Sequence, residues 1–200
     1  MKKIIFGDLE NQILQLENKR TEERRIERIK NEIKTKNYIY NEKINENEQY
    51  AVEQIDSTMG DAVWSIEKIT DNGTKYTKIN TINVTTPSKI KFFENGLGFL
   101  ERPTSIYCGK ADLLVTHDSG KTFHKIDFPS GTFTLSDSEG KDWEECYDYF
   151  YVPTLEDDGT LTVLASGGYE GGYNQGKTRA KYISQDNGYT WKFISEIYTN

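Results

Sequence analysis

The chain has 200 residues, and its 35% hydrophobic and 12% aromatic residues are enough for a hydrophobic core in one or two domains. Its formal charge of −7 is uneven, because residues 1–50 hold 11 basic and 10 acidic side chains while residues 51–200 hold 14 basic and 22 acidic ones. An acidic surface repels phosphate backbones and disfavours nucleic-acid binding, but it is compatible with cations and with uncharged ligands such as sugars. No stretch approaches the roughly 20 apolar residues of a membrane span.

Residues 1–50 are predicted to form a helical segment and a linker. Residues 8–46 contain neither proline nor glycine, and their apolar side chains lie near one side of a 3.6-residue period: Leu9, Ile13, Leu16, Ile26, Ile29 and Ile33. Arg20, Glu23 and Arg24 interrupt this stripe, so a coiled-coil heptad is only partly satisfied. The helix is therefore either solvated, self-associating or partner-binding, and the Asn- and Glu-rich stretch 38–50 is interpreted as the linker.

The start of the chain is similar to the charged start of a secretory signal, MKKIIF, but its apolar run ends at Gly7. Such a signal needs roughly 7–15 apolar residues, so no complete signal peptide is recognised. Cys108 and Cys146 lack the CxxC spacing of a metal cluster and are expected to be either buried thiols or one disulfide. No metal or other cofactor is predicted.

From residue 60 onward the sequence is typical of β-structure. Short runs rich in β-branched and aromatic residues alternate with glycine-containing turns such as DNG, ENG, DSG and EDDG. The predicted strands are 63–69, 75–82, 89–93, 98–102, 112–116, 121–128, 147–153, 160–166, 179–184 and 189–197. Residues 51–200 are therefore predicted to form a β domain.

One eight-residue phrase occurs twice in this domain, as THDSGKTF and as SQDNGYTW. The two copies share a hydroxyl, an Asp, a Gly, a Thr and an aromatic residue in register: Thr116, Asp118, Gly120, Thr122 and Phe123, then Ser184, Asp186, Gly188, Thr190 and Trp191. In such a turn the Asp accepts hydrogen bonds from backbone N–H groups, the Gly takes a positive φ, and the aromatic ring packs beneath the turn. The phrase predicts a self-capping β-hairpin in which these residues are structural.

The pattern S/T-x-D-x-G-x-T-W/F resembles the Asp-box, or BNR repeat, of sialidases and other β-propellers. The resemblance implies that each copy occupies the turn between the third and fourth strands of a blade, away from any catalytic centre. A degenerate third copy, ITDNGTKY, keeps Asp71, Gly73 and an aromatic residue but lacks the leading hydroxyl and the Thr. An isoleucine follows each aromatic residue by three positions: Ile79, Ile126 and Ile194. This spacing favours a repeated strand.

The fold class predicted from these features is mainly β: a partial Asp-box propeller of about two and a half four-stranded blades, preceded by the long helix. A propeller closes with typically 4–8 blades, so this number cannot close. Either the chain is a piece of a longer protein, or several copies complete a ring, or the helix covers the open face. Self-association is accordingly expected through the open blade face or through the helix.

The resemblance also raises the possibility of sialidase activity. Sialidases clamp the sugar carboxylate with three arginines, use a Tyr activated by Glu as nucleophile, and use an Asp as general acid. Residues 51–200 contain only Arg102 and Arg179, and FLERP does not reproduce the F/Y-R-I-P motif of the family. A complete sialidase site within the chain is therefore not expected, and a hydrolase would need a site completed elsewhere.

Three further features are interpreted as structural or solvated. His117 and His124 are predicted to be surface histidines and not a metal or catalytic pair. The Gly-rich GGYEGGYNQGK lacks phosphate-binding spacings and is predicted to be a loop. An acidic run without regular calcium-ligand spacing is predicted to be a solvated loop: Asp137, Glu139, Asp142, Glu144, Glu145 and Asp148.

One cluster is predicted to bind a ligand. Ligands of propellers with this layout meet the mouth formed by the innermost strands and loops, which brings together Tyr147, Asp148 and Tyr149 with Tyr169, Glu170 and Tyr173. Aromatic faces beside hydrogen-bond acceptors suit a sugar ring, whereas in the alternative interpretation the tyrosines only cover the sheet.

The sequence therefore predicts a non-catalytic Asp-box module that binds or scaffolds a carbohydrate or a protein. The alternative is a fragment of a sialidase-like glycoside hydrolase. The family resemblance implies an extracytoplasmic location.

Overall fold

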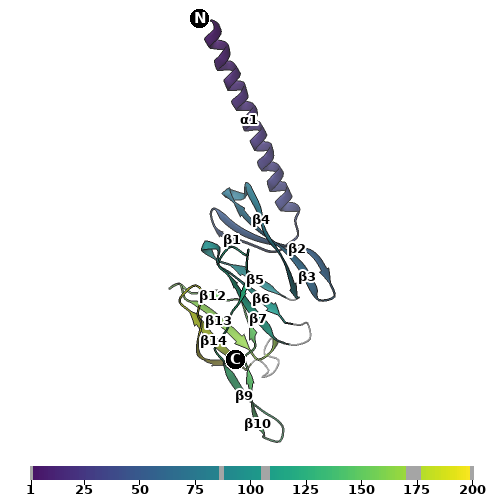
Figure 1. Ribbon diagram of the computed structural model, residues 1–200, viewed down its shortest axis with the longest axis vertical. Helices are drawn as coiled ribbons and strands as arrows, with labels where there is room; N and C mark the ends of the chain where they lie inside the picture. Colours follow the sequence, from purple (N-terminus) through teal and green to yellow (C-terminus); the bar gives the residue numbers. More distant parts are fainter. Residues whose placement is uncertain (1, 86–87, 105–108, 170–176, 199–200) are drawn as a thin grey trace. The chain divides into compact units, whose positions relative to one another are not determined.

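The computed structural model describes residues 2–85, 88–104, 109–169 and 177–198. In these residues one helix, α1 (Lys2–Thr35), precedes strands β1 to β15, so the fold is mainly β with an N-terminal helix, as predicted (Figure 1). The chain divides into two compact units. The first unit contains residues 1–53 and 67–78, and the second contains residues 54–66 and 79–200. The predicted boundary at residue 50 lies close to the first of these breaks, but the prediction did not assign residues 67–78 to the first unit.

Helix α1 leaves most of its described side chains in solvent. Leu9, Ile13 and Leu16 are 52%, 49% and 57% exposed. The apolar residues of its second half are half-buried: Ile26, Ile29 and Ile33. Among the described residues, no helix has both the length and the apolar character that crossing a membrane requires.

A four-stranded sheet with the order β1-β2-β3-β4 follows the helix. Its strands are β1 (Tyr38–Asn45), β2 (Glu48–Thr58), β3 (Asp61–Thr70) and β4 (Lys75–Thr85). Strands β3 and β4 confirm the two predicted here, but β1 and the start of β2 occupy the stretch 38–50, so its interpretation as a linker is wrong. Tyr38 and Tyr40 in β1 are half-buried, and Ile39 between them is 46% exposed, so burial follows the two-residue period of a strand.

In the first unit, Lys36 joins the end of α1 to the sheet. Its ammonium lies 2.5 Å from Glu67 Oε1 and 3.2 Å from Glu53 Oε2, and it also contacts the Tyr76 hydroxyl. Glu67 is only 1% exposed, so its buried negative charge is stable only because Lys36 and the neighbouring hydroxyl compensate for the lost hydration. Desolvation alone would lower the pKa of Lys36, but the hydrogen bonds with Glu67, Tyr76 and Glu53 outweigh it and raise the pKa above its ordinary value.

In the second unit the strands form two groups. The first group is β5 (Lys89–Phe92), β6 (Gly98–Pro103), β7 (Ala111–Thr116) and β8 (His124–Lys125). The second group is β11 (Tyr149–Phe150), β13 (Leu161–Ser166), β14 (Thr178–Ser184) and β15 (Lys192–Tyr198), with β12 (Thr154–Leu155) paired to β13. Neighbouring strands within each group are antiparallel, and one parallel pair, Tyr149 with Ala111, joins the groups. Each strand predicted in this region is present, although β8 and β11 are shorter than predicted.

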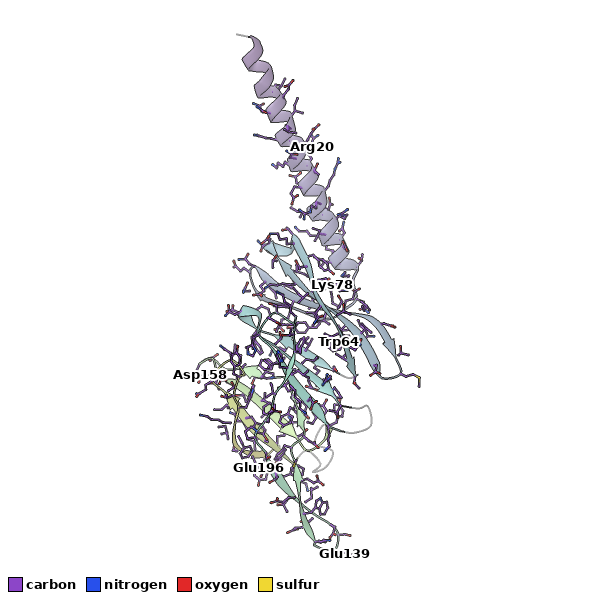
Figure 2. The ribbon with its side chains drawn as sticks, in the orientation of Figure 1. Arg20, Trp64, Lys78, Glu139, Asp158 and Glu196 are labelled. Atoms are coloured by element: carbon purple, nitrogen blue, oxygen red, sulfur yellow. The ribbon has the colours of Figure 1, made fainter. Side chains whose placement is uncertain are left out.

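A hairpin of β9 (Thr132–Ser136) and β10 (Asp142–Cys146) is inserted between the two groups. Figure 2 labels Glu139 at its tip. Asp137 closes the turn, because its Oδ1 accepts the N–H groups of Glu139 and Lys141 at 2.9 and 2.8 Å. The acidic run predicted to be a solvated loop is therefore largely a β-hairpin, in which strand pairing supplies the backbone hydrogen bonds.

The hydrophobic core of the second unit combines residues from both groups of strands. Strands β6 and β7 contribute Phe99, Leu113 and Val115, and β13 and β14 contribute Leu161, Val163, Ala165, Ala180 and Tyr182. Because side chains alternate across a strand, the residues between these core positions lie on the opposite face of β13 and β14. That opposite face carries the pocket described below.

Candidate functional site

Both copies of the repeated phrase form hydrogen-bonded turns. In the first repeat, residues 116–123, Thr116 Oγ1 donates to Asp118 Oδ1 at 2.8 Å and accepts the Gly120 N–H at 2.9 Å. Asp118 also accepts from Thr122, through the backbone N–H at 2.9 Å and through the hydroxyl at 2.7 Å. One hydroxyl and one carboxylate thus close the turn between β7 and β8.

The second repeat, residues 184–191, makes the same bonds between β14 and β15. Ser184 Oγ donates to Asp186 at 2.7 Å and accepts the Gly188 N–H at 2.9 Å. Asp186 accepts the Thr190 N–H at 2.9 Å and the Thr190 hydroxyl at 2.6 Å. The geometry is therefore set by the shared residues of the phrase and not by the residues between them.

These bonds keep both Asp side chains ionised. Partial burial alone would raise the pKa of Asp118, but the hydrogen bonds from Thr122 and Thr116 outweigh it and lower the pKa to about 2. For Asp186 the hydrogen bonds from Thr190 are the largest cause, and its pKa is also lowered to about 2. At neutral pH these carboxylates are fixed hydrogen-bond acceptors.

The glycine and the aromatic residue of the phrase complete the turn. Gly188 has a φ of 85°, and a Cβ placed there would meet Phe99 at 3.0 Å, so glycine is required both by conformation and by space. Trp191 is 7% exposed, donates its indole N–H to the Gly188 carbonyl at 3.1 Å, and packs edge to face on Phe99. Phe123, its counterpart in the first repeat, is half-buried.

The degenerate third copy forms a different turn. Asp71 and Gly73 both have positive φ, 52° and 81°, within a single 3₁₀ turn. The Asp71 carboxylate faces Lys75 at 3.1 Å, and the Thr74 hydroxyl donates to the Asp71 carbonyl at 2.8 Å. Because the leading hydroxyl and the Thr are missing from this copy, the carboxylate binds a solvent-exposed lysine in their place.

The two full repeats contact each other through His117. Its Nε2–H donates to the Asn187 carbonyl at 2.9 Å, and its ring stacks on Tyr189 with centroids 4.0 Å apart. His117 is half-buried by these contacts, whereas His124 is exposed, so the two histidines predicted to lie on the surface differ in environment. The first of them links the two turns.

Two of the tyrosines predicted to bind a ligand lie in the core. Tyr147 is 3% exposed and donates to Glu196 on β15 at 2.6 Å, and Tyr149 is 1% exposed and donates to Glu101 at 2.9 Å. Burial, followed by the neighbouring carboxylate, raises the pKa of each phenol. Both rings are therefore protonated donors inside the protein and offer no face to a ligand.

The other members of that cluster are only partly described. Asp148 accepts the Gly168 N–H at 3.0 Å and pairs with Lys110 at 3.2 Å. Tyr169 is 43% exposed, and its ring centroid lies 5.2 Å from that of Tyr149. Glu170 and Tyr173, together with most of the Gly-rich stretch, lie outside the described residues. Tyr169 is thus the exposed tyrosine among the described members of the cluster.

A pocket of about 450 Å³ opens on the face of β13–β15 that points away from the core. We call it the β13–β15 pocket. It is lined by Tyr151, Val152, Thr154, Glu156, Thr162, Leu164, Arg179, Lys181 and Ile197. The strand register places Leu164 opposite Lys181, and Arg179 opposite Ile197, so the lining comes from adjacent strands.

Two polar atoms of this pocket are buried without a hydrogen-bond partner among the described residues: Arg179 Nε and Thr162 Oγ1. Thr162 is 8% exposed. Leaving a buried donor or acceptor unpaired costs about 1–3 kcal/mol, so an occupant that bonds to these groups recovers free energy. By contrast, Arg102 already pairs with Asp112 at 3.7 Å, and it is the arginine of a larger hollow of about 780 Å³ beside the β2–β3 hairpin.

Tyr151 forms the aromatic wall of the β13–β15 pocket. Its hydroxyl lies 2.9 Å from Ser166 Oγ, which itself donates to the Gly168 carbonyl at 2.6 Å, so Tyr151 is the donor of the pair. The guanidinium carbon of Arg179 lies 5.4 Å from the Tyr151 ring centroid, within cation–π range. The ring is therefore held in place from two sides.

Buried Glu101 fixes the segment that carries Tyr151. It is 0% exposed and accepts the Val152 N–H at 3.3 Å together with the Tyr149 hydroxyl. Burial raises the pKa of Glu101, although the hydrogen bond from Tyr149 and the charge of Lys89 lower it in part. Glu101 is thus a positioning residue for the pocket wall.

Sequence reasoning missed Tyr151, Thr162 and Lys181. The available signal was the alternation in YDYFYVP, where Tyr151 continues the series of Tyr147 and Tyr149. Arg179 was considered only as one member of a sialidase clamp.

Within the described ranges no three His, Cys, Asp or Glu side chains are grouped so that they could hold a metal ion. Cys146 is a free and exposed thiol, so the interpretation as a buried or disulfide-bonded cysteine is wrong for it. Cys108 lies outside the described residues.

No family model and no curated protein matches the chain. Its resemblance to the Asp-box family therefore rests on the residues of the repeats alone.

Proposed function

We propose that the chain is a non-catalytic Asp-box module of β-propeller type that binds carbohydrate in the β13–β15 pocket. The observation that carries the proposal is the pocket itself, where a fixed Tyr151 ring stands beside the unpaired polar atoms of Arg179 and Thr162. A sugar ring packs its C–H surface on an aromatic face and exchanges hydrogen bonds through its hydroxyls. A volume of about 450 Å³ is within the range of small-ligand sites.

The arrangement of the repeats supports the propeller-type scaffold. The two full repeats occupy the turns β7–β8 and β14–β15, and the degenerate copy occupies the turn between β3 and β4. Asn80 on β4 donates to the carbonyls of Gly120 and Lys121 in the first repeat at 3.0 and 2.9 Å. His117 of the first repeat bonds to the second. Asn80 and His117 thus connect the first repeat to β4 and to the second repeat, as blade-to-blade contacts do in a propeller.

The hydrolase alternative would require a reactive Tyr–Glu pair. Tyr149 and Glu101 have that composition and are hydrogen-bonded, but their 1% and 0% exposures keep substrate away from them. Burial and the charge of Glu101 raise the pKa of Tyr149, which opposes formation of the phenolate. The pair therefore supports a structural role in a binding module.

A glycan array tests this proposal, read beside a fluorogenic sialoside assay on the same preparation. Binding of at least one glycan class is expected, with loss in Tyr151→Ala and retention in Tyr198→Ala, which removes an exposed tyrosine outside the pocket. No sialoside turnover is expected. Absence of glycan binding, or equal binding by Tyr151→Ala and the unaltered chain, would overturn the proposal, and turnover would favour the hydrolase.

A further inference from the structure

We infer that the β13–β15 pocket selects sugars that carry an anionic group, a carboxylate or a sulfate ester, with Arg179 and Lys181 as its counter-charges. The inference rests on the proposed function and specifies the class of ligand. It is unexpected for this chain, because residues 51–200 have 14 basic and 22 acidic side chains and the surroundings are acidic.

The two cations lie on one side of strand β14. Arg179 and Lys181 are two positions apart and line the pocket, whereas Ala180 and Tyr182 between and beyond them are 0% exposed in the core. This alternation fixes both charged side chains on the pocket face. Substitution of either one therefore alters the pocket without removing a core side chain.

Neither cation is neutralised by a carboxylate in the part of the chain that the structure describes. Four other basic residues of the second unit do have a carboxylate partner: Arg102 and Lys125 pair with Asp112, Lys89 with Glu101, and Lys110 with Asp148. A half-buried cation without a counter-charge is unfavourable, because part of its hydration is lost and no negative charge compensates for that loss. An anionic ligand supplies the missing partner.

The Arg179 guanidinium has donors of the kind that an oxyanion accepts. The Nε and one terminal nitrogen of a guanidinium form a two-donor edge that meets two oxygens of a carboxylate or sulfate. Arg179 lines the pocket, and its Nε is buried and has no protein partner among the described residues. The Thr162 hydroxyl supplies a further neutral hydrogen-bonding group in the same lining.

The acidic residue of the lining, Glu156, constrains the orientation of the ligand. Glu156 accepts a hydrogen bond from Thr154 Oγ1 at 3.3 Å, and both residues line the pocket. A carboxylate repels a second anion but accepts hydrogen bonds from sugar hydroxyls. The anionic group is therefore placed at Arg179 and Lys181, the hydroxyls at Glu156, and the ring face against Tyr151.

The test is a binding titration of the full chain, followed by NMR, with three sugars that differ only at C6: methyl galactoside, methyl galacturonide and methyl galactoside 6-sulfate. The two anionic sugars are expected to bind at least about tenfold more tightly than the neutral one at low salt, which corresponds to about 1.4 kcal/mol. The difference should shrink as salt is raised. The carboxylate and sulfate arms show which of the two groups is preferred.

Arg179→Gln and Lys181→Gln should each reduce the preference for the anionic sugars severalfold, and Lys121→Gln, which removes a charge in the first repeat outside the pocket, should not. Melting temperatures establish whether each variant is folded. If a variant does not fold, the salt dependence of the preference in the unaltered chain tests the inference independently. Equal affinity for all three sugars would overturn the inference and leave the proposed function intact. If the chain binds none of the three sugars and also binds no glycan on the array, both the inference and the proposed function are overturned. A preference that persists in both Gln variants would also contradict the inference.

Discussion

The ring of His117 lies flat on the ring of Tyr189, with the centroids 4.0 Å apart and 6° between the planes. His117 is the second residue of the first repeat and Tyr189 is the sixth residue of the second. Neither position belongs to the shared residues that close the turns. The variable positions of the phrase thus connect one turn to the next, while the shared positions build each turn.

The first prediction concerns this ring pair. His117→Ala and Tyr189→Ala should each destabilise the protein, and the double variant should lose less than the sum, with a coupling of about 0.5–1.5 kcal/mol. Urea unfolding of the four proteins in this double-mutant cycle measures the coupling. Strict additivity would mean that the stacked rings contribute no interaction of their own.

The second prediction separates the full repeats from the degenerate copy. Asp118→Ala and Asp186→Ala each remove the ionised acceptor of the Thr hydroxyl and N–H of their turn, and the loss of hydrogen bonds to a charged group should cost about 1.5–3 kcal/mol of unfolding free energy. Asp71→Ala removes only an exposed contact with Lys75 and should cost less than about 1 kcal/mol. Chemical denaturation of the three variants checks this ranking, and a cost for Asp71→Ala as large as for the others would contradict it.

The third prediction concerns acid stability. The folded-state pKa values of Asp118 and Asp186 are about 2, below the ordinary value of 3.8, so the unfolded chain binds protons first as the pH falls. Their contribution should be complete above about pH 4 and should decline as the pH falls towards 2. Melting temperatures of the unaltered chain and of Asp118→Asn should therefore converge between pH 4 and pH 2. A constant difference across that interval would show that the charge of Asp118 is not involved.

A fourth prediction addresses the buried charges of the first unit. Lys36→Met leaves Glu67 as a buried carboxylate without its counter-charge and should cost about 3–5 kcal/mol. Adding Glu67→Gln should restore part of this loss, because the buried charge is then removed. Unfolding followed by circular dichroism compares the two variants. Equal stability of Lys36→Met and the unaltered chain would mean that the ion pair does not hold the end of α1.

Local patterns were sufficient to predict most of the β-structure. Strands β3 to β7, β13 and β14 were found within one to three residues, because their β-branched and aromatic residues are bounded by glycine turns. Strand β1 was missed because its exposed positions are occupied by Asn, Glu and Lys, so the composition is typical of a linker although the alternation at Tyr38 and Tyr40 is that of a strand.

Local sequence patterns could not predict which residues of the proposed ligand-binding cluster are buried. A sequence places Tyr147 and Tyr149 near one another but does not say which face of their segment is buried. In the structure both rings are buried, and their hydroxyls donate to the carboxylates of Glu196 and Glu101. Spacing also overestimated the equivalence of the repeats: Ile126 is buried at 8% exposure, whereas Ile194, at the same position after the second repeat, is 48% exposed. The burial of each isoleucine depends on which strands lie beside it, and only the tertiary structure determines that.

We propose that the β13–β15 pocket binds the ligand and that the repeats give structural support. The most direct test of this division of roles is the affinity of methyl galacturonide for the unaltered chain, Tyr151→Ala and Asp118→Ala, measured by NMR titration below the lowest of their melting temperatures. We predict that Tyr151→Ala loses at least about fivefold in affinity, while Asp118→Ala, which melts at a lower temperature, binds as the unaltered chain does. Loss of binding in Asp118→Ala with full binding in Tyr151→Ala would contradict the account.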